Sequence, residues 1–497
     1  TAAFGATNLI ATHDSTGFLA TLDANGNFLW AARVGGVSDP LPWQSKAVAI
    51  VCDPTGNTYA AGVFDGTGTF GSLNLTALQA DDVFLARFDA SGTCTWVQQM
   101  GGDANAVTGL GLNSGSGIYL CGMYTSATAT FGSTTLPNAN TGNTDIFLTY
   151  CDASGAPQWA QRLAVNTLGE AAYSLSVDAT GNAWVCGDQL ATSDYGSITL
   201  VGSGMFLTEV DQTGAFLQAA RPTSAYVATH TLGPEGGHYV YGQFFTDWFD
   251  ATDSTLVGQT PVYEGYLARY DENLSFQWLA RCGVHRATYD GMSDIAVDDL
   301  GNSYVGGHLN TSAIVCYDTL VVGIENVGLV VSERDPSGTC VWTRLIRTTQ
   351  PFGLNNEARI TGIARAANGD VVIAGQFHGT LDFGGANLQT QGGKDLFVAR
   401  YDMNGNLLWA HSEGGSGNQE ATSVEVDAAG NVIVVGTFTD AFTIGGTMLT
   451  SEGLSDGFIA KYNAAGSSLW AQAFGGASWD AAGRVACDAA GNIHVTG

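Results

Sequence analysis

The sequence has little charge and almost no lysine. Only 13% of its 497 residues are charged, and 46 acidic against 17 basic residues give a formal net charge of −29. The lysines are Lys46, Lys394 and Lys461. Nucleic acids and anionic membranes are bound through basic patches, so this balance argues against both as partners. It permits cations as partners and favours solubility outside the cell.

Several other signals are missing. No run of about 18 apolar residues is present, which argues against a transmembrane helix. The first residues, 1–5, have neither methionine nor a basic region, so we interpret them as a mature or trimmed start rather than a signal peptide. The nine cysteines include no Cys-x-x-Cys pair, which argues against zinc. We expect most of them to be small buried hydrophobes, with Cys282 and Cys316 as the pair to examine for a disulfide.

Catalytic motifs are also missing. The sequence contains no Gly-x-Ser-x-Gly elbow and no His-Glu-x-x-His pair, and its eight histidines are scattered. We therefore expect no catalytic residues and no enzyme. A hydrolase or lyase that uses carboxylates on facing loops stays open as the minor alternative.

What the sequence does contain is a repeat. Its clearest copy, 86–96, reads as a strand, an Asp-x-x-Gly turn and a strand that carries tryptophan. Asp and Gly suit such a turn, because Asp bonds its own backbone and Gly tolerates positive φ. An eighth copy has Gln218 where tryptophan is expected. The tryptophans of the other copies, which we expect to fill the space between repeats, are Trp30, Trp96, Trp159, Trp278, Trp342, Trp409 and Trp470.

A second hairpin alternates with the first. It has an apolar strand, a turn of Asp-x-x-Gly-Asn type and a strand that ends in glycine, as in 53–62, and its closing glycines are 55 to 68 residues apart. The two hairpins give four strands for each repeat, which we name A, B, C and D in chain order. A–B and C–D turns are short, whereas B–C and D–A connections are long and irregular.

The count of repeats predicts an all-β fold. Seven complete repeats lie between residues 37 and 476, and a split one combines 1–36 with 477–497. We therefore predict a single domain, 1–497: an eight-bladed β-propeller of four-stranded antiparallel blades. The ring is closed by two strands from each terminus, which limits exposed sheet edges.

The repeat resembles the bacterial SBBP-type β-propeller repeat family. The resemblance rests on Asp-x-x-Gly-Asn-x-x-x-x-Gly and then Asp-x-Phe-x-Ala-x-Tyr/Phe-Asp-x-x-Gly-x-x-x-Trp, best seen in 395–409, and it covers essentially the whole chain. It implies a secreted or cell-surface protein of a bacterium and no single activity. The copies around Gln218 and Gly233 depart from the pattern, because one lacks tryptophan and the other lacks aspartate.

The irregular connections are the first candidates for binding, because loops on a rigid scaffold usually carry it. Trp248, in a B–C connection, stands apart from the repeat pattern. Trp43 and Trp479 flank the split blade and could form a platform for a ligand. The candidate ligand-binding residues are Trp43, His285, Arg286, Tyr289, Phe352, Asn356, Trp479 and Trp248.

Acidic residues recur at one position of the D–A connections, close to eight residues before the A–B turn. One interpretation is a ring of oxygen ligands for calcium at the mouth of a central channel. The other is that each acid caps the start of strand A, so we expect no cofactor, with calcium as the alternative. The weak metal candidates are Glu170, Asp290, Glu357, Glu420 and Asp480.

The sequence therefore predicts a secreted or surface-displayed propeller that acts as a binding or adhesion module. Its partner would be a glycan or an extracellular protein, met by the irregular face, with no membrane insertion. The alternative is a non-catalytic scaffold or docking subunit of a larger cell-surface assembly. A polysaccharide-degrading enzyme ranks below both.

Overall fold

The structure is a computed structural model of the chain, and every structural statement below refers to the residues that it describes. These are 1–10, 15–37, 47–79, 81–102, 104–138, 142–164, 168–223, 226–245, 249–251, 254–256, 263–284, 294–308, 327–348 and 358–497.

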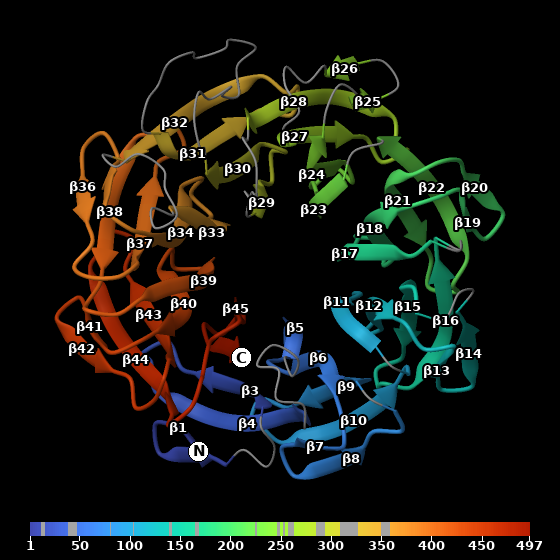
Figure 1. Cartoon of the computed structure of the whole chain (residues 1–497), viewed down its shortest axis with the longest axis horizontal. Helices are drawn as coiled ribbons and strands as arrows, with labels where there is room; N and C mark the ends of the chain where they lie inside the picture. Colours follow the sequence, from blue (N-terminus) through green and yellow to red (C-terminus); the bar gives the residue numbers. More distant parts are fainter. Residues whose placement is uncertain are drawn as a thin grey trace.

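Strands form the whole of the regular structure in this part of the chain, and they are arranged as a ring (Figure 1). Eight blades, each of four antiparallel strands, surround a central channel, with strand A innermost and strand D outermost. The predicted eight-bladed β-propeller is therefore confirmed. Over the described ranges, no helix has the length and apolar character needed to cross a membrane.

We number the blades from the one that contains both termini. The first four blades, each from strand A to strand D, are β45 (Arg484–Cys487), β46 (Ile493–Thr496), β3 (Ser15–Leu22) and β4 (Phe28–Val37); β5 (Ala47–Cys52), β6 (Thr58–Phe64), β9 (Asp82–Phe88) and β10 (Cys94–Met100); β11 (Ala104–Leu112), β12 (Ile118–Tyr124), β15 (Asp145–Cys151) and β16 (Pro157–Leu163); and β17 (Glu170–Val177), β18 (Ala183–Gln189), β21 (Gly204–Val210) and β22 (Phe216–Thr223).

Blades 5 to 8 follow in the same order. They are β23 (Tyr226–Leu232), β24 (His238–Phe245), β27 (Tyr263–Tyr270) and β28 (Phe276–Val284); β29 (Asp294–Val297), β30 (Ser303–His308), β31 (Val327–Arg334) and β32 (Cys340–Thr348); β33 (Arg359–Arg365), β34 (Val371–Phe377), β37 (Asp395–Tyr401) and β38 (Leu407–Glu413); and β39 (Gln419–Val426), β40 (Val432–Phe438), β43 (Asp456–Tyr462) and β44 (Ser468–Gly476).

Blade 1 joins the two ends of the chain. β3 pairs with β46 from Leu19 opposite Thr496 to Leu22 opposite Ile493. The Phe18 N–H also donates to the Gly497 carbonyl at 2.8 Å. The predicted closure of the ring by two strands from each terminus is confirmed.

The tight turns owe their shape to the aspartate at their start. In the A–B turn of blade 2, Asp53 Oδ1 accepts hydrogen bonds from the N–H groups of Thr55 (2.9 Å) and Asn57 (3.0 Å). Gly56 in the same turn has φ 82°, a region that favours glycine. Where a turn has aspartate and glycine at this spacing, the hairpin can therefore form locally, before any contact between blades is made.

Tryptophans link each blade to the next. The ring of Trp342 in blade 6, for example, lies on Gly405 in the C–D turn of blade 7, where a Cβ would overlap it. Its indole N–H donates to the Met403 carbonyl of that turn at 3.2 Å. We call this arrangement a Trp–turn link. The links are Trp30 on Gly92, Trp96 on Gly155, Trp159 on Gly214, Trp278 on Gly338, Trp342 on Gly405, Trp409 on Gly466 and Trp470 on Gly26.

The one departure from this pattern is matched across the junction between blades 4 and 5. Gln218 stands where tryptophan is expected, and Leu274 stands where the partner turn has glycine elsewhere. The Gln218 amide donates to the Glu272 carbonyl at 3.0 Å, which replaces the indole hydrogen bond. Leu274 keeps the turn backbone at φ 59°, and its half-buried side chain packs against the hydrophobic core at this junction.

This matching can be tested by a double-mutant cycle. Gln218→Trp alone should destabilise the protein by about 1–3 kcal/mol, because the indole collides with Leu274. Leu274→Gly alone removes a strained left-handed conformation but leaves a gap, so its effect should be small. The double variant should be more stable than the sum of the two by about 1–3 kcal/mol in urea unfolding. Additive effects would show that the two residues are not coupled.

The B–C connections contain a further hairpin that the sequence pattern did not predict. In blade 2, β7 (Thr67–Phe70) and β8 (Leu73–Thr76) form a hairpin whose first strand pairs with β4 of blade 1. The others are β13 (Thr128–Phe131) with β14 (Thr134–Pro137), β19 (Ser193–Tyr195) with β20 (Ile198–Leu200), β25 (Phe249–Ala251) with β26 (Ser254–Leu256), β35 (Thr380–Asp382) with β36 (Asn387–Gln389), and β41 (Ala441–Ile444) with β42 (Thr447–Thr450).

Blade 1 has the same feature, supplied by the start of the chain. β1 (Ala2–Phe4) and β2 (Thr7–Leu9) form a hairpin, and β1 pairs with β44 of blade 8. Strands of three or four residues are too short for alternation to be recognised, which is why these connections read as irregular.

The cysteine prediction is tested only in part. Among the described residues, seven cysteines are free thiols, and Cys94, Cys121, Cys151 and Cys186 are buried. Burial raises the pKa of the Cys121 thiol to about 12, which makes it unreactive. Cys316 lies outside the described residues, so its pairing with Cys282 stays a prediction.

Candidate functional site

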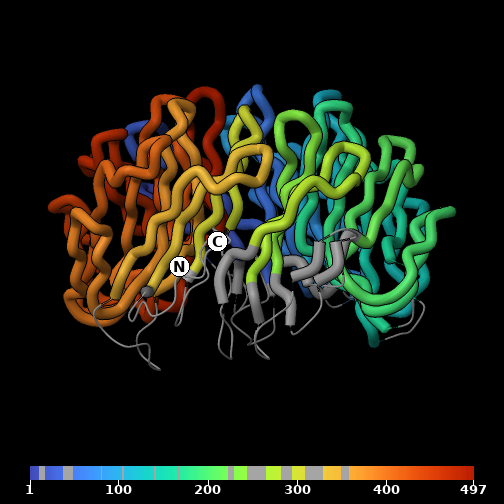
Figure 2. The backbone as a smooth tube through the Cα atoms, turned by 90° about the horizontal axis from the view of Figure 1, so that it is seen from above, coloured from blue at the N-terminus to red at the C-terminus, as the bar shows by residue number. Residues whose placement is uncertain are grey.

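The two rims of the ring differ. The short A–B and C–D turns lie along one rim, which is the upper one in Figure 2. The long B–C and D–A connections lie along the opposite rim, which we call the loop face. Strand A of each blade therefore runs from the loop face along the channel to a tight turn.

Most of the predicted ligand-binding residues cannot be placed. Trp479 is the described member of the set, and it is exposed over 66% of its surface in the D–A connection between β44 and β45. Its backbone forms a parallel bridge with Ser455. The residues that lie outside the described part are Trp43, His285, Arg286, Tyr289, Phe352, Asn356 and Trp248, together with the acidic candidates Asp290 and Glu357.

The three described acidic candidates have separate surroundings. Glu170 is buried at the start of β17. Glu420 Oε1 lies 3.5 Å from the Lys394 ammonium. Asp480 Oδ2 accepts a hydrogen bond from the Gly476 N–H at 2.9 Å, and burial raises the pKa of this carboxyl. Within the described ranges, no three His, Cys, Asp or Glu side chains are grouped closely enough to hold a metal ion.

The channel itself is the main cavity on this axis. It encloses about 560 Å³ and is lined by strand A of all eight blades. One position of strand A, four residues before the A–B turn, supplies much of the lining in seven blades. These residues are Ala49, Gly109, Ser174, Thr229, Asp294, Ser423 and Arg484.

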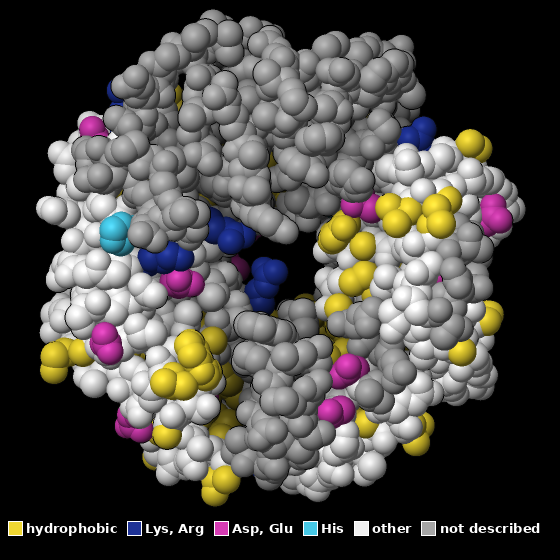
Figure 3. Space-filling view, in the orientation of Figure 1, with side chains coloured by type: hydrophobic (Ala, Val, Ile, Leu, Met, Phe, Trp, Pro, Cys, Tyr) yellow, Lys and Arg dark blue, Asp and Glu magenta, His cyan; other side chains and the backbone are white. Residues whose placement is uncertain are grey.

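Charge is confined to one half of the channel. Four neighbouring strands, β29, β33, β39 and β45, carry Asp294, Arg365, Glu425 and Arg484, whereas the lining residues of β5, β11 and β17 are uncharged. Figure 3 shows apolar side chains along one side of the central opening, and Lys and Arg side chains on the other side and within it. The channel therefore presents two unlike walls.

The two carboxyls of the charged half are held by backbone groups. Asp294 accepts hydrogen bonds from the N–H groups of Ile295 (2.9 Å) and Ile363 (3.5 Å). Burial raises its pKa, and these bonds and the Arg484 charge oppose the rise. Burial also raises the pKa of Glu425, and the Asp294 charge adds to that rise. Both carboxyls thus take up protons at higher pH than free ones.

The two arginines of this half differ. Arg365 is engaged, because its guanidinium lies 3.5 Å from Asp298 and over the ring of Tyr304. Arg484 is exposed within the channel, and in the described part of the chain it makes no hydrogen bond or ion pair. A guanidinium stays charged in proteins and offers five donors, so Arg484 is the group best suited to hold an anionic ligand.

The uncharged half offers an aromatic ring and hydroxyl groups. Tyr173 is 43% exposed and lines the channel next to Ser174. Behind this wall, His230 contacts both the Ser174 hydroxyl (3.4 Å) and His238 (3.1 Å). Burial lowers the pKa of His230 well below its ordinary value and that of His238 to about 3, so both imidazoles are neutral.

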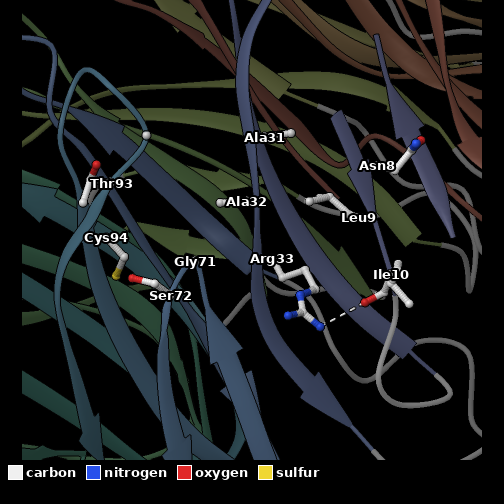
Figure 4. A pocket seen from close by; sticks show the side chains of 11 residues that line it. Asn8, Leu9, Ile10, Ala31, Ala32, Arg33, Gly71, Ser72, Thr93 and Cys94 are labelled. Atoms are coloured by element: carbon white, nitrogen blue, oxygen red, sulfur yellow. Dashed lines mark hydrogen bonds between the residues drawn. The ribbon is translucent and has the colours of Figure 1, made fainter. Parts of the chain in front are cut away.

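A second cavity lies on the outer surface of the ring (Figure 4). It encloses about 670 Å³ between β2, β4 and the turn of the β7–β8 hairpin. Arg33 points into it, but the guanidinium donates to the Ile10 carbonyl at 3.0 Å. The remaining lining is small or uncharged, including Ala31, Ala32 and Ser72. This groove therefore offers less for recognition than the channel does.

Sequence reasoning missed the channel residues. It considered the acidic groups about eight residues before the A–B turn, whereas the lining lies four residues before that turn. A signal was present: at that position, Asp294 and Arg484 are the charged residues among Ala, Gly, Ser and Thr.

The chain was compared with protein families, with curated proteins and with solved structures. No protein-family profile matches the chain. It is 22% identical over 503 residues to an uncharacterized WD repeat-containing protein of Acanthamoeba polyphaga mimivirus, which covers 90% of this chain and 34% of that protein. The chain thus spans about a third of the length of this curated relative.

Solved structures with a similar arrangement include two other proteins. One is the WD40 domain of Neurospora crassa Pan2, with TM-score 0.38, 11% identity and coverage of 91% of this chain and 89% of that one. The other is puromycin hydrolase, with TM-score 0.41, 12% identity and coverage of 85% and 52%. The chain is an eight-bladed β-propeller with a WD-repeat relative.

Proposed function

We propose that this propeller is a secreted or surface-displayed binding module, of the bacterial SBBP-type repeat family, that takes a glycan at the loop face and channel mouth. The observation that carries the proposal is the divided lining of the channel. A ligand with one apolar face and several hydroxyl groups fits a cavity with an aromatic wall and a polar wall. The volume of about 560 Å³ also falls in the range of ligand pockets.

A second feature of the loop face supports the same proposal. Trp479 keeps 66% of its surface exposed, although an indole of this size would gain from burial. Exposed aromatic rings of this kind are typical of surfaces that bind a partner. The low content of charged residues is no obstacle to glycan binding, because hydroxyl and amide groups can make most of the polar contacts with a sugar.

The proposal is tested by thermal unfolding of the purified chain with a panel of neutral and acidic oligosaccharides, each with calcium and with a chelator. A ligand at about 100 times its Kd should add roughly 2.7 kcal/mol to the free energy of unfolding. We expect a rise in Tm with at least one sugar, and a smaller rise in Trp479→Ala. The absence of a rise with every sugar would contradict the proposal, and a rise with calcium alone would indicate a structural ion instead.

A scaffold role is the second candidate, and one observation favours it. Strand D exposes an apolar side chain immediately before the tryptophan position in five blades, each with 48–51% of its surface exposed. These residues are Leu29, Leu217, Val341, Leu408 and Leu469. Such a band of apolar side chains around the outer side of the ring could pack against another subunit. Cross-linking that depends on Leu408→Ser and Leu469→Ser, with no sugar binding, would favour this role.

A further inference from the structure

The free guanidinium in the channel needs a partner that the described part of the chain does not supply. Several other arginines are engaged: Arg400 Nε donates to Asp370 at 2.8 Å, and Arg162 Nη2 lies 2.9 Å from Asp145. Arg484, in contrast, is solvent-exposed in a protein whose net charge is −29. An unopposed cation at the centre of an acidic ring attracts an anion to that point.

The neighbouring carboxyls do not neutralise Arg484. Asp294 Oδ1 is held by the Ile295 N–H at 2.9 Å, and Glu425 Oε1 is held by the Val426 N–H at 3.0 Å. Neither lies within ion-pair distance of the Arg484 guanidinium, although the charge of Asp294 is felt there. The guanidinium therefore keeps its donors available for a ligand.

The wall opposite these charges suits a ring rather than an extended chain. Tyr173 is 43% exposed, and Ser174 and Thr108 line the channel beside it. The Ser174 hydroxyl donates to the His230 carbonyl at 3.2 Å and the Thr108 hydroxyl to the Cys121 carbonyl at 3.5 Å, so the two hydroxyl oxygens are left as acceptors for a ligand. Aromatic faces pack on the apolar face of a sugar ring, while hydroxyls bond its rim.

We infer that the channel binds an acidic sugar, with Arg484 as the residue that recognises its carboxylate and Tyr173 as the platform for its ring. This inference rests on the proposed function and narrows it from glycans in general to uronate-bearing ones. The guanidinium can pair with a carboxylate through two parallel hydrogen bonds that the opposite charges strengthen, whereas a neutral sugar offers no charge. Arg359, exposed at the loop-face end of β33, adds a second cation near the mouth.

The test is calorimetric titration at low salt with oligogalacturonate and with a neutral galactose oligomer of the same length. We expect the acidic oligomer to bind more tightly than the neutral one. Arg484→Gln should raise the Kd of the acidic oligomer by about tenfold or more and leave the Kd of the neutral oligomer unchanged. Arg347→Gln is the matched control, because Arg347 is exposed on the outer strand β32 and should not matter. Asp294→Asn should increase the affinity for the acidic oligomer, since the substitution removes a negative charge from the channel.

The outcomes separate this inference from the proposed function. Equal affinity for both oligomers, insensitive to Arg484→Gln, would overturn the inference and leave a neutral-glycan module. Binding of neither oligomer would remove the inference and count against the proposed function as well. A polyglutamate peptide that binds as tightly and depends equally on Arg484 would overturn the assignment to a sugar. Loss of acidic-sugar binding in Tyr173→Ala, with folding intact, would support it.

Discussion

Replacing Lys461 with methionine is expected to lower the free energy of unfolding by about 3–5 kcal/mol, because it leaves a buried carboxylate without its cation. The Lys461 ammonium lies 2.9 Å from Asp427 Oδ2, and the two side chains are 2% and 7% exposed. The ammonium also donates to the Ala24 carbonyl of blade 1 at 3.3 Å. The pair therefore ties blade 8 to the blade that closes the ring.

The pKa of Asp427 shows the same dependence. Burial alone would raise it, but hydrogen bonds from Asn431 and the Lys461 charge outweigh burial, so the pKa lies below its ordinary value. A carboxyl with a lowered folded-state pKa stabilises the fold above its unfolded pKa and loses that effect as pH falls through the folded value. The cost of Lys461→Met should therefore be largest near pH 7 and shrink in acid.

Lys394→Met is the matched control for this substitution. Its ammonium lies 3.5 Å from Glu420, but both side chains are about one-third exposed, at 30% and 34%. Exposed pairs contribute less than about 1 kcal/mol, so this variant should be nearly neutral in urea unfolding. If Lys461→Met cost no more than Lys394→Met, the Lys461–Asp427 pair would not be buried in solution.

Replacing Trp342 with alanine should lower the free energy of unfolding by about 3–5 kcal/mol. Only 4% of its surface is exposed. The ring stacks on Tyr401 with centroids 6.1 Å apart, and the Arg344 guanidinium lies 5.6 Å from its centroid. Alanine leaves a cavity between blades 6 and 7 and an unpaired Met403 carbonyl.

The adjacent residue provides the control. Val341 belongs to the same strand, but its side chain points outward and is 48% exposed, so Val341→Ala should change stability by less than about 0.5 kcal/mol. Denaturant unfolding followed by tryptophan fluorescence and by circular dichroism would compare the two variants. A difference of less than 1 kcal/mol between them would contradict the Trp–turn link as a source of stability.

The fold was predictable because most hairpins carry a recognisable sequence pattern within their own turn. The Asp-x-x-Gly turns act through hydrogen bonds within five residues, as Asp53 does, so repetition alone revealed the strand order and the split blade. The hairpins in the B–C connections were not predictable, since strands such as Ser193–Tyr195 are too short to show a period.

The site was harder to predict, for a different reason. The channel wall is assembled from two or three residues of each blade, so Arg484 and Tyr173 line one cavity only when the ring is closed. The coupling of Gln218 with Leu274 is equally non-local, because it depends on which turn receives which outer strand. Neither relation leaves a pattern within a single repeat.

The Trp–turn links all run in the same direction around the ring. Strand D of each blade contacts the C–D turn of the next one, through tryptophan at seven junctions and through Gln218 at the junction of blades 4 and 5. Trp470 closes the cycle on Gly26. The contacts therefore give the ring a direction, because in the described part of the chain strand D of each blade always contacts the turn of the following blade and never that of the preceding one. Loss of one tryptophan link therefore weakens one junction of the closed ring, and the two blades at that junction should be the first to separate.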